Sequence, residues 1–153
     1  MEKYFGVCYY PELYPKEKQE AFIREDIENM RRARFNVVRM AEFCWCLMEP
    51  REGVYDFDWL EEIVDRLGQN GIYTVLCTPT ACQPVWMARR YPETLYVDNL
   101  GVQRSYGGRH YHCYNSPIFR DLTEKICLEM SRRFGRNPYV LGFQVDNEMG
   151  QEH

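Results

Sequence analysis

Polar residues that could do chemistry follow apolar runs of the sequence, at the points where those runs end. Arg39 and Glu42 lie at the end of one run and Thr78 and Thr80 at the end of a second, while residues 146–148, an Asp-Asn-Glu sequence, follow a third. A carboxyl group beside a side-chain amide can serve one substrate as an acid and as a hydrogen-bond partner. Each group also has a simpler explanation, because a carboxylate after a strand is usually only solvated and Arg39 with Glu42 could be an ion pair. Convergence of the three groups would favour a functional site.

A second set of candidates is the H-x-H-C sequence formed by His110, His112 and Cys113. In an extended chain the two imidazoles would lie on one side, and imidazole and thiolate are both zinc ligands. A structural zinc site needs four ligands and this triplet supplies three. A metal- or thiol-based module built on the triplet is therefore kept as an alternative.

Aromatic residues accompany these candidates. Trp45, Trp86, Tyr106 and Tyr111 all fall in segments expected to be loops. Flat aromatic faces suit a sugar ring, whose C–H faces are apolar while its edges form hydrogen bonds. The alternative is that these side chains only seal the end of the fold.

The elements that must position these residues alternate between two patterns. Apolar runs typical of strands occupy Tyr4–Tyr10, Phe35–Phe43, Ile72–Thr80 and Val140–Val145. Apolar residues at helical spacing occupy about Lys16 to Arg34, Asp58 to Asn70 and Ile118 to Phe134, and Asn115 or Ser116 is expected to cap the last of these helices.

Strands that are apolar on both faces and are separated by helices predict a parallel sheet. The first two spacings between strand starts match one unit of an eightfold β/α barrel. We therefore expect the α/β class and a (β/α)8 TIM barrel, of which residues 1–153 form about the first four strands, a half barrel in one incomplete domain. A long segment between Thr80 and Pro117 has no strong period, and loops of this length are usually functional.

The composition excludes several classes of function. Of 153 residues, 45% are hydrophobic and 27% charged, which is typical of a globular protein, and the net charge of −4 with no basic block argues against nucleic acid or membrane partners. The N-terminus does not resemble a signal peptide, and no apolar stretch approaches a membrane span. Seven scattered cysteines predict reduced thiols and a cytoplasmic protein.

Seven short sequences together resemble a known family. These are GVCYYPE at 6–12, VRMAEF at 38–43, LMEPREGVYDFDWL at 47–60, CTPTACQPVWM at 77–87, YPE at 91–93, GGRHYHCYNSP at 107–117 and FQVDNEMG at 143–150. In this order they are similar to the N-terminal part of the catalytic barrel of glycoside hydrolase family 42, the β-galactosidases.

The resemblance implies roles for individual residues. Glu148 would be the acid/base of a retaining hydrolysis of terminal β-D-galactosides, Asn147 would bind the 2-hydroxyl group of the sugar and Arg109 would bind galactose. Cys113 lies where zinc-binding members have the first ligand of a four-cysteine site, whose other ligands would lie beyond residue 153. No cofactor is implied for the chemistry, a structural zinc and a homo-oligomer are implied for a longer protein, and the expected partner is a β-galactoside.

A retaining glycosidase needs two carboxyl groups, one to protonate the departing oxygen and one to attack the anomeric carbon. The acid must stay protonated near neutrality, which burial and the neighbouring negative charge provide. In the family the nucleophile follows the seventh strand, so we interpret the 153 residues as a fragment that is itself inactive. A noncatalytic sugar-binding or scaffold remnant remains an alternative.

Overall fold

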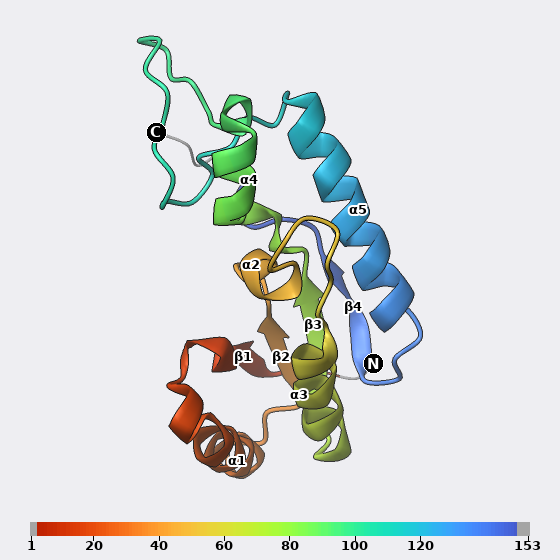
Figure 1. The fold of residues 1–153 in the computed structure, drawn as a ribbon. Helices are drawn as coiled ribbons and strands as arrows, with labels where there is room; N and C mark the ends of the chain where they lie inside the picture. The colour runs from red at the N-terminus through yellow and green to blue at the C-terminus, as the bar shows by residue number, and fades with distance from the viewer. Residues whose placement is uncertain (1–2, 150–153) are drawn as a thin grey trace.

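The computed structural model describes residues 3–149 and contains one parallel sheet of four strands with helices packed against it (Figure 1). The strands are β1 (Gly6–Cys8), β2 (Val37–Met40), β3 (Tyr73–Cys77) and β4 (Val140–Gln144), and they pair side by side in sequence order. The α-helices are α1 (Lys16–Arg32), α2 (Trp45–Met48), α3 (Asp58–Gln69), α4 (Val85–Arg90) and α5 (Pro117–Phe134), with 3-10 turns η1 (Pro11–Leu13), η2 (Pro79–Ala81) and η3 (Pro92–Thr94).

All four predicted strands and all three predicted long helices are present, and the strands are shorter than predicted. The apolar run at Tyr4–Tyr10, for example, contributes only Gly6–Cys8 to the sheet. Parallel strands in sequence order, joined through α1, α3 and α5, form the order expected for the first half of a β/α barrel. Ser116 is the predicted cap of α5, and its Oγ accepts a hydrogen bond from the amide of Phe119.

The core lies between the helices and one face of the sheet. Val38 and Met40 of β2 and Leu76 of β3 are fully buried there, beneath apolar stripes of α1, α3 and α5. The other face of the sheet is less buried: β2 and most of β3 alternate buried with half-buried residues, and β1 is exposed throughout. In a closed barrel the second face would meet opposite strands, and four strands do not close one.

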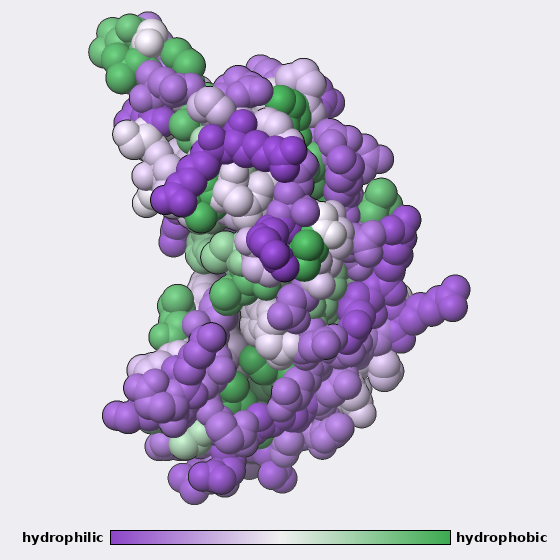
Figure 2. Space-filling view, in the orientation of Figure 1, coloured by the Kyte–Doolittle hydropathy of each residue, from purple (hydrophilic) through white to green (hydrophobic). Residues whose placement is uncertain are grey.

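The segment between β3 and α5 contains only short elements, as its lack of a strong period predicted. After η2, α4 and η3, isolated antiparallel bridges join Leu95 to His112 and Val97 to Gln103, so that residues 95–112 form a doubled-back rim loop. This loop projects beyond α4 (Figure 1), and Figure 2 shows hydrophobic residues gathered at its tip, where Leu100 is exposed. The rim loop borders the carboxyl ends of the strands, which is where β/α barrels carry their active sites.

Two further observations concern the environment of the chain. None of the helices in residues 3–149 is both long and apolar enough to cross a membrane. All seven cysteines are free thiols, which agrees with the prediction of reduced cysteines.

Candidate active site

The turn after β4 carries the Asp-Asn-Glu sequence and is held by specific contacts. Asp146 and Glu148 both have left-handed backbone conformations, with φ of 56° and 57°. Such conformations are costly for residues other than glycine and persist where their surroundings hold them. The amide of Asp146 donates to Thr78 Oγ1 over 2.8 Å, and the amide of Asn147 donates to Asp146 Oδ1 over 2.6 Å. The end of β3 therefore helps to fix the turn that presents Asn147 and Glu148.

Arg39 joins the ends of β2 and β4. Its Nη1 lies 2.9 Å from Gln144 Oε1 and 3.1 Å from Asn147 Oδ1, and its Nη2 lies 2.8 Å from Glu42 Oε1. The predicted convergence is thus confirmed for the ends of β2 and β4, and the contact of Thr78 with the Asp146 amide adds the end of β3. Arg39 and Glu42 do form an ion pair, but the guanidinium is shared with Asn147, so it does more than close the end of the sheet.

Glu42 is fully buried, and a third strand end reaches it. Tyr10, just after β1, donates a hydrogen bond to Glu42 Oε1 over 2.6 Å. Burial and the contact with the carboxylate of Glu42 raise the pKa of Tyr10, which strengthens its tendency to remain the donor in this hydrogen bond. Burial lowers the pKa of Arg39, but contacts with Cys8 and the charge of Glu42 outweigh this and raise it overall.

Sequence reasoning did not select Tyr10 or Gln144. Tyr10 follows a strand in the same way as Glu42, so the rule that found Glu42 could have found it. Gln144 is a polar residue inside an otherwise apolar strand, which is also a recognisable signal.

Arg109 and Glu148 lie together although they come from different parts of the chain. Arg109 Nη1 is 2.9 Å from Glu148 Oε2, and the two side chains are 58% and 46% exposed. The guanidinium also lies over the ring of Phe43, 4.7 Å from its centroid. Glu148 therefore lacks the burial and the negative neighbour predicted for an acid, and faces a cation instead.

A groove of about 730 Å³ begins at this pair and continues along the rim loop. Its lining includes Glu148, Arg109 and Tyr111 together with polar side chains of the rim loop such as Asp98 and Gln103. Polar side chains in this lining can form hydrogen bonds with a ligand that carries many hydroxyl groups. A second hollow of about 520 Å³ lies between α1 and α3, and none of the candidate residues lines it.

The H-x-H-C triplet does not form a ligand cluster in the structure. His112 is buried and stacks on Phe119 with ring centroids 4.0 Å apart, and His110 Nδ1 contacts the hydroxyl of Tyr114 at 2.7 Å. Burial lowers the pKa of His112 to about 4, so the ring is neutral. Across residues 3–149, no three His, Cys, Asp or Glu side chains are grouped to hold a metal ion, so the triplet gives no support to a metal-based module.

Cys113, the candidate zinc ligand, has a half-buried thiol. In the part of the chain that the structure describes, it belongs to no group of three metal-ligating side chains. These residues can supply one thiolate to a zinc site and not a complete site.

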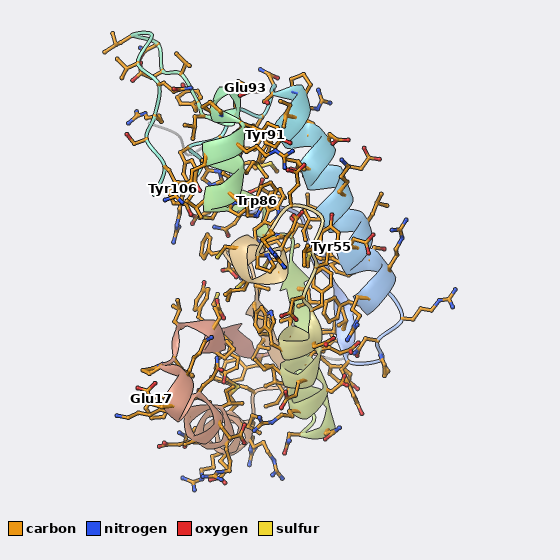
Figure 3. All side chains as sticks on the ribbon, viewed as in Figure 1. Glu17, Tyr55, Trp86, Tyr91, Glu93 and Tyr106 are labelled. Atoms are coloured by element: carbon orange, nitrogen blue, oxygen red, sulfur yellow. The ribbon has the colours of Figure 1, made fainter. Side chains whose placement is uncertain are left out.

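The four aromatic candidates divide into two kinds. Trp45 and Tyr111 are buried: the indole of Trp45 donates to Glu49 Oε2 over 2.7 Å, and the hydroxyl of Tyr111 donates to the carbonyl of Gln83. Their burial favours the alternative that they seal the end of the fold, although Tyr111 also lines part of the groove. Trp86 is half-buried, while Tyr106 is exposed and packs edge-to-face on Tyr111. Trp86 belongs to α4, Tyr106 lies on the side of α4 that faces the rim loop, and both are far from Glu17 on α1 (Figure 3).

The arrangement combines one accessible carboxyl group with two hydrogen-bonding side chains on one rim. Glu148 can exchange a proton with a ligand in the groove, while Asn147 and Arg109 can bind its polar groups. These groups could form the acid/base side of an active site that uses two carboxyl groups.

Comparison with known proteins gives consistent matches. Residues 8–153 match the profile of glycoside hydrolase family 42, described as β-galactosidase. The chain is 44% identical over 145 residues to a β-galactosidase of Thermus thermophilus and 42% identical over 145 residues to the β-galactosidase BgaH of Haloferax lucentense. These alignments cover 95% of this chain and 22% and 21% of the relatives.

Solved structures agree with the sequence matches. The fold superposes on the β-galactosidase of Rahnella sp. R3 with a TM-score of 0.91 at 37% identity, covering 96% of this chain and 21% of that one. For the β-galactosidase of Halorubrum lacusprofundi the TM-score is 0.89 at 39% identity, with 98% and 22% covered. This chain thus spans about a fifth of the length of the relatives it matches, and it belongs to glycoside hydrolase family 42.

Proposed function

We propose that this chain supplies the acid/base half of a retaining β-galactosidase that hydrolyses terminal β-D-galactosides. The observation that carries the proposal is the placement of Asn147 and Glu148 on the turn after β4, beside Arg109, in a chain of this family. Glu148 would protonate the departing glycosidic oxygen and later activate water. Asn147 would bind the 2-hydroxyl group and Arg109 another part of galactose.

The ion pair between Arg109 and Glu148 defines the state before substrate binds. Both side chains are about half exposed, so the pair contributes little to stability and is readily exchanged. We expect galactose hydroxyl groups to take over the hydrogen bonds of Arg109. Glu148, released from the cation and covered by the substrate, would then be in the environment that an acid requires.

The reaction also needs a carboxylate that attacks the anomeric carbon, about 5–5.5 Å from the acid in retaining enzymes. The resemblance places that residue after a seventh strand, and the described sheet has four strands. We therefore assign the activity to a polypeptide of the family's length and expect the 153 residues by themselves to be inactive.

Several further properties of that longer polypeptide belong to the same proposal. Cys113 would be the first ligand of a structural zinc, which would hold the rim loop in place and take no part in the chemistry. A β-galactoside oligosaccharide or glycoside would be the substrate, the assembly a homo-oligomer and the location the cytoplasm. The seven free thiols support the last point.

A chimera tests the proposal. The chimera is the Thermus thermophilus β-galactosidase in which the segment matched by this chain is replaced by the 153 residues. We expect it to hydrolyse 4-nitrophenyl β-galactoside and to release β-galactose first, as followed by proton NMR. Release of α-galactose first, or no turnover by a folded chimera, would contradict the proposal. Binding of galactose by the 153-residue chain together with an inactive chimera would favour a noncatalytic sugar-binding remnant.

A further inference from the structure

Gln144, the last residue of β4, contacts both Arg39 and the turn that follows the strand. Its Oε1 accepts a hydrogen bond from Arg39 Nη1 over 2.9 Å. Its Nε2 donates to the carbonyl oxygen of Asp146 over 2.7 Å and to Asn147 Oδ1 over 3.3 Å. The side chain therefore bridges the guanidinium of Arg39 and the turn that carries Asn147.

The chemistry of Arg39 decides which way both amides point. A guanidinium has five N–H donors and no acceptor, so each amide atom that faces Arg39 Nη1 must be an oxygen. The Gln144 amide therefore turns Oε1 toward Arg39 and Nε2 toward Asp146. The backbone carbonyl of Asp146 can only accept, which agrees with this orientation. The Asn147 amide likewise turns Oδ1 toward the protein, where it lies between the donors Arg39 Nη1 and Gln144 Nε2.

With Oδ1 held in this way, the nitrogen Nδ2 of the Asn147 amide must point away from Arg39 and Gln144. The carbonyl oxygen already accepts from two donors, while no hydrogen bond within residues 3–149 engages Nδ2. Asn147 is only 8% exposed, so a ligand that covers it must satisfy this donor. The group it meets must offer a lone pair, as the oxygen of a sugar hydroxyl does.

We propose that Gln144 is a positioning residue that fixes the Asn147 side chain with Nδ2 toward the substrate, so that Asn147 serves only as a donor to the 2-hydroxyl oxygen. This inference rests on the proposed function and adds to it the direction of that hydrogen bond. Gln144 itself touches no substrate. It acts through Asn147, and it does so together with Arg39.

The test compares two substrates that differ in one hydroxyl group. In the chimera, Gln144→Glu replaces the Nε2 donor by an oxygen that cannot donate to Asn147 Oδ1. We expect kcat/KM for 4-nitrophenyl β-galactoside to fall about threefold to tenfold, the usual effect of one misplaced neutral hydrogen bond. The 4-nitrophenyl 2-deoxy-β-galactoside has no 2-hydroxyl group, so its kcat/KM should stay at the value of the parent chimera.

Two further variants separate positioning from support of the fold. In an Asn147→Ala background, Gln144→Glu should have no additional effect on the galactoside. Thr78→Val removes the acceptor of the Asp146 amide and loosens the turn that carries both Asn147 and Glu148, so it should lower kcat/KM for the 2-deoxy substrate as well as for the galactoside.

Equal losses on both substrates for Gln144→Glu, or a further loss in the Asn147→Ala background, would overturn the inference while leaving the proposed function intact. Failure of the folded parent chimera to hydrolyse either substrate would overturn the proposed function and, with it, the inference.

Discussion

The Arg109 guanidinium and the Glu148 carboxylate form an ion pair across 39 residues of sequence, with Nη1 2.9 Å from Oε2. The pair links the rim loop to the turn after β4 and lines the groove. Because exposed ion pairs contribute at most about 1 kcal/mol, a ligand can separate these two side chains at little cost.

Glu148→Ala in the chimera should slow galactosides with poor leaving groups far more than activated aryl galactosides. Only the poor leaving groups need a proton from the acid, and positioned acid catalysis is typically worth about 10²–10⁴-fold. The measurement is kcat/KM across a series of aryl galactosides of rising leaving-group pKa.

Azide provides the control for the same variant. A small anion needs no general base, so added azide should accelerate Glu148→Ala with an activated substrate and yield β-galactosyl azide. Uniform losses over the whole series, with no azide adduct, would remove Glu148 from the acid/base role.

Arg109→Ala should lower kcat/KM for galactosides about ten- to a hundredfold, since a hydrogen bond to a charged group is worth roughly 1.5–3 kcal/mol. The matched control is Arg90→Ala, which breaks a surface ion pair with Glu52 away from the groove and should leave kcat/KM unchanged. Wild-type efficiency for Arg109→Ala would contradict its assignment to galactose binding.

Asn147→Ala should lower kcat/KM for galactosides about tenfold or more, through loss of the contact with the 2-hydroxyl group. The loss should be larger in kcat than in KM, because contacts with this hydroxyl strengthen in the transition state. An increase in KM with unchanged kcat would show that Asn147 binds substrate and transition state equally.

The 153-residue chain alone should show no β-galactosidase activity and should associate in solution. β1 and β4 are both edges of the described sheet, and apolar side chains such as Phe5, Leu141 and Phe143 are exposed beside them. Aryl galactoside hydrolysis and light scattering on the purified chain are the measurements. A stable monomer that turns over galactosides, with the activity lost in Glu148→Ala, would refute the two-carboxyl argument.

His112→Phe should make the chimera less sensitive to acid. The pKa of His112 is lowered to about 4 in the fold, so below pH 6.5 the unfolded chain binds a proton that the folded chain does not. Stability is therefore lost as the pH falls from 6.5 toward 4, by about 2 kcal/mol at pH 5. Phenylalanine can keep the stack on Phe119 and cannot be protonated.

Urea denaturation followed at pH 7 and at pH 5 checks this prediction. Carboxylates titrate equally in both proteins, so only the difference between His112→Phe and the parent reports on His112. The advantage of the variant should grow on going from pH 7 to pH 5. An equal advantage at both values would mean that His112 is not the group responsible.

The sequence by itself determined the elements and their order. The apolar runs and the helical spacing predicted β1 to β4 and α1, α3 and α5, because these patterns depend on residues a few positions apart. Ser116 before Pro117 predicted the start of α5 for the same local reason. The resemblance of seven short sequences was enough to indicate the family, which the comparisons then confirmed.

Only the tertiary structure decided which polar groups meet and in which direction they point. Arg39 and Asn147 are 108 residues apart, and their contact depends on the order and register of β2, β3 and β4 together. The same holds for Tyr10 against Glu42 and for Trp45, which turns into the core although its segment was expected to form a rim loop. Periodicity shows which face of an element is apolar. The partner of a side chain is set by what packs opposite, and that depends on parts of the chain far away in sequence.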